Sequence, residues 1–263
     1  MQAQNKNMFS LQNKVAIVSG SGSGIGAAIA ETFAKAGALV HVAERDKSSG
    51  QETVSKIEKS GGRAKLIVTD VTQESECQAL VKRVLAENHG QCHVLVNNAG
   101  IGHVGTILTT EAEDLERLWN VNLMGAYFLS RAVLPSMIER RSGSIVNIGS
   151  IASIGGMEKR FAYTITKHAI LGLTRSMALD HSETGVRINC ICPGRVKTPF
   201  VDARLREYPN PEEYIKQMEA PHAMKRMAQP PEIAAAALFL ASDEASFVTG
   251  SAFAVDGGYT AGK

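Results

Sequence analysis

Short apolar runs alternate with helical patterns along most of the chain, and this alternation restricts the fold more than any other feature. Residues 15–19 are apolar up to the last position, and residues 25–36 then place apolar side chains at helical spacing. Residues 39–43 and 47–59 repeat this pair of patterns. Strands that are apolar on both faces, each followed by a helix, predict a parallel sheet that helices cover on both sides.

The same patterns continue toward the end of the chain. Further strands are predicted at residues 64–68, 94–96, 144–148, 187–191 and 252–255, and further helices at residues 74–88 and 111–138, the latter with a bend near Gly125 and Pro135. Right-handed crossovers then give an α/β fold of the Rossmann type, a doubly wound parallel sheet of about seven strands. No linker interrupts the pattern, so we expect one domain over residues 11–263, after a disordered tail at residues 1–10.

Charge and hydropathy argue against two classes of partner. The 263 residues include 28 Lys and Arg against 26 Asp and Glu, so we expect neither nucleic acid nor a membrane surface as a partner. The longest apolar run, residues 233–241, is too short to cross a bilayer, and residues 1–10 lack the apolar core of a signal peptide, which predicts a cytoplasmic protein.

Cys190 and Cys192 lie in an apolar strand pattern and are expected to be buried thiols, and no metal site is expected.

A glycine-rich turn joins the first predicted strand to the first predicted helix. Residues 19–26 read S-G-S-G-S-G-I-G. Glycines allow a sharp turn and a close approach to a pyrophosphate, and the helix N-terminus presents free N–H groups to it. A tight turn without a ligand is the alternative, but the position in the first βαβ unit favours a dinucleotide site.

Glu44 ends the second strand, about 20 residues after the glycines, where a carboxylate can accept hydrogen bonds from the adenosine ribose. A carboxylate there repels a 2′-phosphate and favours NAD over NADP, although the adjacent Arg45 is able to hold such a phosphate. Asp70 and Asn98 follow the third and fourth strands and lie at the same edge of the sheet. By themselves, both are compatible with ordinary polar loop positions.

Five motifs stand in an order that is typical of one enzyme family. The glycine turn matches T-G-x-x-x-G-x-G with Ser19 in place of Thr, and residues 97–100 read N-N-A-G. The other motif residues follow along the chain: Asn122, Ser150, Tyr163 with Lys167 as Y-x-x-x-K, and Pro193-Gly194. On these residues, the chain resembles the compact branch of the short-chain dehydrogenase/reductase family over residues 11–258.

The resemblance implies a role for each matching position. The catalytic residues would be Asn122, Ser150, Tyr163 and Lys167. The residues that bind NAD would be Gly20, Ser23, Gly24, Ile25, Gly26, Glu44, Asp70, Val71, Asn98, Ala99, Gly100, Tyr163, Lys167, Pro193, Gly194, Val196 and Thr198. Relatives are mostly tetramers, so a homotetramer is expected.

The residues themselves support this chemistry. Tyr163 and Lys167 are spaced i and i+4 and share one helix face. A tyrosine acts as a base at neutral pH only when nearby positive charge stabilises its phenolate form, and Lys167 supplies such a charge. Ser150 would bind the substrate oxygen, and Asn122 would hold a water that relays protons, or else satisfy free backbone groups at a helix bend.

Arginines point to the substrate class. Arg160 precedes Tyr163 by three residues, Arg195 follows the Pro-Gly motif, and Arg204 and Arg206 lie in the charged segment at residues 198–228. Guanidinium groups bind carboxylates through two parallel hydrogen bonds. The surrounding segments resemble type 2 hydroxybutyrate dehydrogenases and keto-deoxy sugar-acid dehydrogenases, so we expect a small hydroxy acid or sugar acid as substrate, under a lid at residues 198–228.

Other functions stay open at this point. Arg204 and Arg206 are equally well explained as solvated charges on a lid helix. The same chemistry on a neutral sugar, a polyol, a steroid or an acyl-thioester ketone is the first alternative. An inactive nucleotide-binding sensor is a remote one, because Ser150, Tyr163 and Lys167 are all present.

Overall fold

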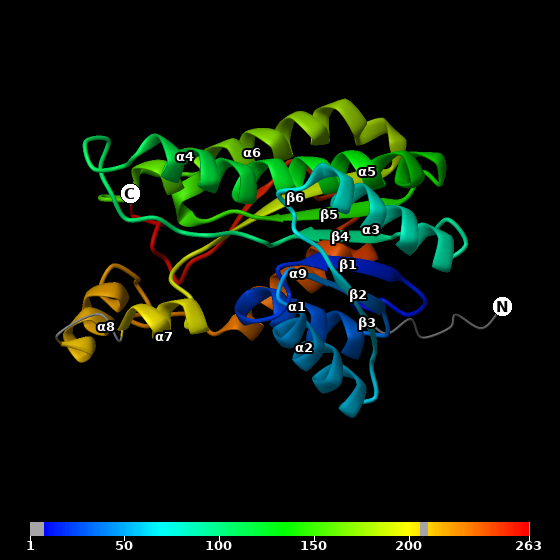
Figure 1. Cartoon of the computed structure of the whole chain (residues 1–263), viewed down its shortest axis with the longest axis horizontal. Coiled ribbons are helices and arrows are strands. Elements are labelled where there is room, and N and C mark those ends of the chain that lie inside the picture. The colour runs from blue at the N-terminus through cyan, green and yellow to red at the C-terminus, as the bar shows by residue number, and fades with distance from the viewer. Residues whose placement is uncertain (1–7, 206–209, 263) are drawn as a thin grey trace.

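Seven parallel strands form one sheet in the order β3-β2-β1-β4-β5-β6-β7 (Figure 1). The computed structural model describes residues 8–205 and 210–262. The strands are β1 (Val15–Ser19), β2 (Leu39–Glu44), β3 (Arg63–Val68), β4 (Val94–Asn97), β5 (Gly143–Ile148), β6 (Val186–Pro193) and β7 (Ala252–Val255). The predicted α/β fold of the Rossmann type is therefore confirmed.

Helices cover both faces of this sheet, as Figure 1 shows. The helices on one face are α1 (Gly24–Lys35), α2 (Lys47–Lys59) and α9 (Pro230–Ala241). Those on the other are α3 (Glu74–Glu87), α4 (Ala112–Trp119), α5 (Gly125–Glu139) and α6 (Phe161–His181). The alternation of strand and helix in the sequence predicts this arrangement, since each crossover places a helix on a sheet face.

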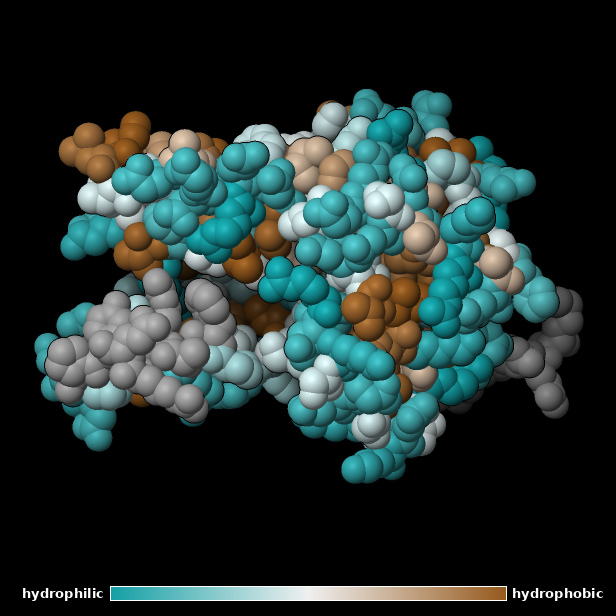
Figure 2. Space-filling model, viewed as in Figure 1, coloured by the Kyte–Doolittle hydropathy of each residue, from teal (hydrophilic) through white to brown (hydrophobic). Residues whose placement is uncertain are grey.

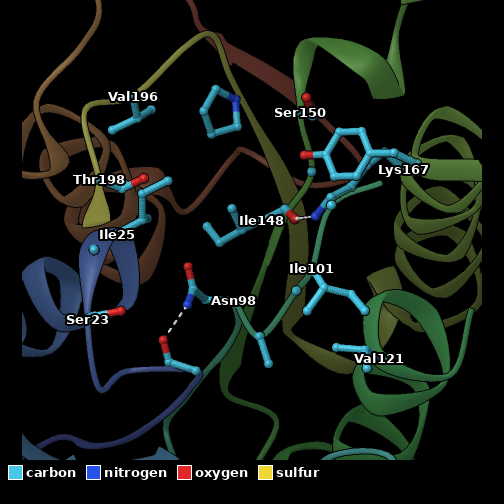
Figure 3. A pocket seen from close by; sticks show the side chains of 18 of the residues that line it. Ser23, Ile25, Asn98, Ile101, Val121, Ile148, Ser150, Lys167, Val196 and Thr198 are labelled. Atoms are coloured by element: carbon cyan, nitrogen blue, oxygen red, sulfur yellow. Dashed lines mark hydrogen bonds between the residues drawn. The ribbon is translucent and has the colours of Figure 1, made fainter. Parts of the chain in front are cut away.

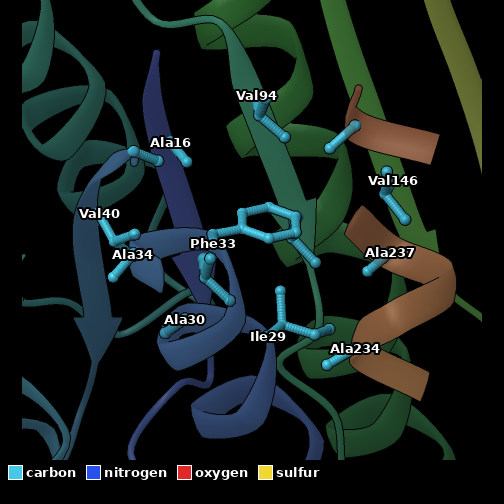
Figure 4. Close-up of a cluster of buried hydrophobic side chains, with 14 of the residues drawn as sticks. Ala16, Ile29, Ala30, Phe33, Ala34, Val40, Val94, Val146, Ala234 and Ala237 are labelled. Carbon is cyan, nitrogen blue, oxygen red and sulfur yellow. The ribbon is translucent and has the colours of Figure 1, made fainter. Parts of the chain in front are cut away.

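Small side chains bring α1 and α9 close together over the sheet. Ile29 and Phe33 of α1 are fully buried, and so are Ala234 and Ala237 of α9. In Figure 4, the Phe33 ring lies between these helices and the strand side chains. The alanine-rich run that is too short for a membrane span is thus a core helix.

The long helix predicted at residues 111–138 is interrupted where a bend was expected. A π-helical turn, η1 (Asn120–Met124), separates α4 from α5 and ends directly before Gly125. A Cβ on Gly125 would lie 2.9 Å from Val71, so the close approach to the loop after β3 requires glycine. Pro135 lies within α5 without ending it.

The same segment, Ala112–Glu139, is the one helical stretch among the described residues that is long and apolar enough to cross a membrane by composition. Leu118, Leu129, Val133 and Met137 on it have no exposed surface. Leu129, Val133 and Met137 pack with side chains of the sheet in one hydrophobic cluster, so this segment is a core helix of the domain.

The domain begins before the boundary predicted from sequence. The Phe9 ring packs edge-on against Phe239, with 6.2 Å between the ring centroids, and Leu11 is fully buried. Residues 1–7 of the predicted tail lie outside the described residues. The contact between Phe9 and a ring of α9 orders the chain at Phe9, and no local sequence pattern reveals such a contact.

The predicted lid segment contains two short helices. They are α7 (Pro199–Leu205) and α8 (Pro211–Glu219), and residues 206–209 between them lie outside the described residues. In Figure 1, both helices project beside the carboxyl ends of the strands. The stretch after α8 returns to the body through a bridge between Val196 and Ala228.

His93 completes the pairing of β1 and β4 at their starts. Its Nδ1 accepts the Val15 N–H at 3.0 Å, and its own backbone N–H donates to the Val15 carbonyl at 2.8 Å. Burial, followed by the charges of Lys14 and Arg140, lowers the pKa of His93 from 6.5 to about 4. The ring therefore stays neutral in the folded protein at pH values that protonate an unfolded histidine.

This difference predicts a pH dependence of stability. As the pH falls from 6.5 toward 4, the unfolded chain takes up a proton that folded His93 does not bind, so the free energy of unfolding should decrease, by about 1–2 kcal/mol for one such histidine. His93→Asn offers an acceptor near the Nδ1 position and does not titrate. The free energy of unfolding can be measured with urea at several pH values between about 4.5 and 7. It should fall less with decreasing pH in the variant than in the wild-type protein, and an equal fall in both would contradict this assignment.

Candidate active site

A cleft of about 440 Å³ lies at the carboxyl ends of the strands. The sheet order reverses between β1 and β4, so the loops after these strands diverge and leave a crevice. Figure 2 shows a recess between the segment that contains α7 and α8 and the body of the domain. All the residues predicted for the cofactor line the cleft except Gly26.

Glycine is required in the turn after β1 because backbone from elsewhere approaches it. Gly20 has a φ of +62°, and a Cβ on it would lie 2.7 Å from the Cα of Ala99. A Cβ on Gly26 would collide with the Gly20 carbonyl and the Asn98 amide. Gly26 therefore does not line the cleft but allows the turn to pack closely against Gly20 and Asn98. The N-terminus of α1 faces the cleft.

Polar side chains at the adenosine end of the cleft already hold backbone. The Glu44 carboxylate accepts N–H groups from Gly22 at 3.0 Å and Arg45 at 2.9 Å. The Asn98 amide donates to the carbonyls of Ser19 and Gly20. The Asp70 carboxylate accepts the Thr72 N–H and hydroxyl. The sequence allowed structural roles for Asp70 and Asn98 but did not predict one for Glu44. These contacts preorganise the loops around the cleft.

Ser150 lies at the end of β5 and begins a short turn. Its Oγ accepts the Ala152 N–H at 3.1 Å, while the Ser153 hydroxyl accepts the Ser150 N–H at 3.1 Å. This reciprocal pair fixes the direction of the Ser150 hydroxyl, which is 8% exposed and lines the cleft. Accepting at one lone pair leaves the hydroxyl proton to be donated to a substrate oxygen.

Lys167 is buried in the same end of the cleft. Its Nζ donates to the Ile148 carbonyl at 2.8 Å, the bond drawn in Figure 3, and lies 5.6 Å from the centre of the Tyr163 ring. Both residues line the cleft, as the i, i+4 spacing predicts. The ammonium group carries two further protons for a ribose hydroxyl and places a positive charge beside the phenol.

Asn122 differs from the other three, because it does not line the cleft. It is 2% exposed and sits in the π-helical turn. Its Oδ1 accepts the Ile101 N–H, and its Nδ2 donates to the Ile101 carbonyl and to the Thr166 hydroxyl. These bonds tie the loop after β4 to α6, and the water-relay role remains a prediction.

Comparison with known proteins assigns this geometry to a family. A family model described as enoyl-(acyl carrier protein) reductase matches residues 20–260. An uncharacterized oxidoreductase from Thermotoga maritima is 42% identical over 253 residues, which are 96% of this chain and 100% of that protein. The chain belongs to the short-chain dehydrogenase/reductase family. It is an oxidoreductase that uses a nicotinamide cofactor on an alcohol or ketone.

Two further relatives of this short-chain dehydrogenase cover nearly its whole length. Dehydrogenase/reductase SDR family member 6 from Danio rerio is 39% identical over 253 residues, 96% of this chain and 99% of that one. A crystal structure from Beutenbergia cavernae, provisionally named an NAD(P)-dependent gluconate 5-dehydrogenase, is 36% identical with a TM-score of 0.89, covering 96% and 99% of the two chains. That structure contains NADP at low occupancy.

The short-chain dehydrogenase places two of the predicted arginines in its cleft. Arg160 precedes α6, lines the cleft, and donates from Nη1 to the His103 carbonyl at 3.2 Å. Arg195 lines the cleft after β6. The Arg204 side chain and the whole of Arg206 lie outside the described residues.

Sequence reasoning missed the apolar walls of the cleft. Figure 3 shows Ile101, Val121 and Ile148 beside the predicted polar residues, and Met157 and Val201 also line the site. Such surfaces suit the flat faces of a nicotinamide or an apolar part of a substrate. No local pattern marks these residues, because they come from separate loops and helices.

The thiols of the C-x-C pair are buried beneath this site. Cys190 and Cys192 have no exposed surface, and their sulfur atoms are 3.9 Å apart. A hydrogen bond with Cys192, together with burial, holds the pKa of Cys190 well above its ordinary value, so this thiol is unreactive. Within residues 8–205 and 210–262, no group of three or more His, Cys, Asp or Glu is arranged to bind a metal.

Proposed function

We propose that this chain is an NAD(H)-dependent dehydrogenase of a small hydroxy acid or sugar acid. One observation carries the proposal: Ser150, Tyr163 and Lys167 line the same cleft as Arg160 and Arg195. The first three supply the means to move a proton, and the arginines supply a carboxylate site. A nicotinamide cofactor fits the cleft, because the glycine turn leaves backbone exposed where a pyrophosphate would lie.

The proposed mechanism assigns one task to each side chain. In the oxidative direction, the Tyr163 phenolate takes the proton of the substrate hydroxyl, and the Lys167 ammonium stabilises that phenolate. Ser150 donates a hydrogen bond to the same substrate oxygen and stabilises its charge in the transition state. A nicotinamide cofactor, when bound, would accept the hydride that leaves the carbon bearing this hydroxyl, which becomes a carbonyl carbon. We propose that protons then leave past Asn122, whose contacts with Ile101 and Thr166 hold the surrounding loop in place.

We propose NAD rather than NADP as the cofactor. The Glu44 carboxylate is held at the edge of the cleft by the Gly22 and Arg45 N–H groups, so a 2′-phosphate would meet a fixed negative charge. Two features weigh the other way. Arg45 also lines the cleft, and the structure from Beutenbergia cavernae contains NADP.

The choice of an acidic substrate rests on the arginines. Arg160 is anchored through the His103 carbonyl and precedes the helix that carries Tyr163, so its position is linked to that of the catalytic phenol. The name given to the Beutenbergia cavernae structure, a gluconate dehydrogenase, agrees with a sugar acid. We propose that the segment at residues 198–228 closes over this substrate, since Thr198, Pro199 and Val201 line the cleft.

We also propose a cytoplasmic homotetramer, which rests on the family resemblance. Exposed apolar side chains on the helices of one sheet face support burial against other subunits: Trp119 on α4, Tyr127 on α5, and Ile165 and Leu179 on α6. All four cysteines are free and buried, in keeping with a reducing compartment.

The first prediction tests the proton transfer. Tyr163→Phe removes the phenolic oxygen but keeps the ring, so we expect kcat to fall by about 10³-fold while the Kd for NADH, from its fluorescence, changes by less than about twofold. Tyr127→Phe removes a phenolic oxygen from α5 at a position that does not line the cleft, and it is the matched control. Turnover of Tyr163→Phe at the wild-type rate would refute the mechanism.

The second prediction concerns the cofactor. The wild-type enzyme should have the higher kcat/KM with NAD, and Glu44→Gln should raise the ratio of NADP to NAD efficiency by about tenfold, because the variant keeps an acceptor but loses the charge. Glu52→Gln, exposed on α2, should leave the ratio unchanged. A wild-type preference for NADP would overturn the assignment of Glu44.

The third prediction concerns the substrate. Arg160→Ala should lower kcat/KM for hydroxy acids by at least about tenfold more than for neutral secondary alcohols, since only the acids lose a charged partner. Arg175→Ala, at an exposed position of α6, should affect both classes equally little. Equal losses on acids and neutral alcohols would support a neutral sugar, polyol, steroid or acyl-thioester ketone instead.

A further inference from the structure

His222 joins three segments at the base of the predicted lid. It follows α8, is 1% exposed, and its ring packs at 5.3 Å from the Tyr259 ring, close to the turn after β7. A Cβ on Gly194 would lie 2.8 Å from the His222 Nε2. The ring and the Asp256 backbone, whose Cα would lie 3.0 Å from that Cβ, both approach the Pro-Gly motif after β6, so glycine is needed at position 194.

The hydrogen bonds of His222 determine which tautomer is present. Nε2 lies 3.0 Å from the backbone nitrogen of Arg195, and a backbone N–H only donates, so Nε2 carries a lone pair. Nδ1 then carries the proton and faces the Glu219 carbonyl at 3.3 Å. The ring thus connects the last turn of the lid helix to the backbone of a residue that lines the cleft.

The stretch that begins at His222 holds Arg195 from both sides. The Arg195 N–H donates to the His222 ring, and the Arg195 carbonyl accepts the Ala228 N–H at 2.8 Å. The next step of the loop is paired as well, since the Lys197 N–H donates to the Ala228 carbonyl. Residues 222–228 therefore hold the backbone of the loop after β6 at Arg195 and at Lys197.

We propose that His222 is a positioning residue that locks the loop after β6, and with it the Arg195 side chain, to the base of the lid. The proposal rests on the proposed function, because it assumes that Arg195 and its loop meet the substrate and cofactor. His222 touches neither. It acts through one hydrogen bond, which its Nε2 accepts from the Arg195 backbone N–H. Another side chain at position 222 can replace this bond only if it has an acceptor atom as far from its own Cα as Nε2 is in histidine.

Two small polar variants separate this role from simple packing. The amide of Gln reaches the position of Nε2, whereas the shorter amide of Asn reaches only that of Nδ1. Neither titrates. His222→Gln should keep the Arg195 amide protected from hydrogen exchange in the full-length apo protein, and His222→Asn should lose that protection. His181→Gln and His181→Asn, at the far end of α6, should leave the exchange unchanged.

Steady-state kinetics supply the second readout. His222→Asn should raise the KM for a hydroxy acid by about tenfold with kcat reduced less, and His222→Gln should restore the wild-type KM, because substrate positioning rather than proton transfer is affected. Equal Arg195 protection in the Gln and Asn variants would overturn the proposal, as would a His222→Gln protein that does not fold. The exchange experiment needs no substrate, so it tests the His222 assignment by itself. If the protein turned over no hydroxy acid, that result would count against the proposed function and leave the exchange result unaffected.

Discussion

The contact between the loops after β1 and β4 is the constraint on which the cofactor cleft depends. The Ser19 hydroxyl accepts the N–H groups of Asn98 and Ala99, and the Asn98 amide donates back to the carbonyls of Ser19 and Gly20. These bonds give partners to polar groups of both loops that the packing would otherwise leave without one. Since the sheet order reverses at this seam, the crevice keeps its shape only while the seam is held.

A second set of buried polar contacts sets the position of α6, which carries Tyr163 and Lys167. The Asn97 amide donates to Asn147 Oδ1 at 2.8 Å, and the Asn147 amide donates to the Thr174 hydroxyl of α6 at 2.8 Å. Asn122 donates to the Thr166 hydroxyl of the same helix. An apolar interface tolerates small shifts of a helix, whereas hydrogen bonds that must be satisfied in a dry interior permit one arrangement. The helix therefore presents Tyr163 and Lys167 in a defined place, which the proposed proton transfer requires.

Much of the fold is predictable from local patterns, and the exceptions have non-local causes. The predicted strand at residues 187–191 extends to Pro193 in the structure, because Cys192 and Pro193 pair with Ala254 and Val255 of β7. The predicted helix at residues 111–138 contains a π-helical turn at Asn122, whose side chain bonds to Ile101, distant in the sequence. Periodicity cannot reveal either feature, since each depends on a partner from another part of the chain.

The sequence by itself determined the order of strands and helices, the glycine turn, and the pairing of Tyr163 with Lys167 on one helix face. These features follow from backbone geometry and side-chain periodicity over a few residues. Only the tertiary structure decided that Arg160 and Arg195 share a cleft with apolar walls, and that His222 supports Arg195 across 27 positions of the chain. Contacts of this kind depend on how the lid and the sheet edge pack together, and that packing is a property of the whole folded domain.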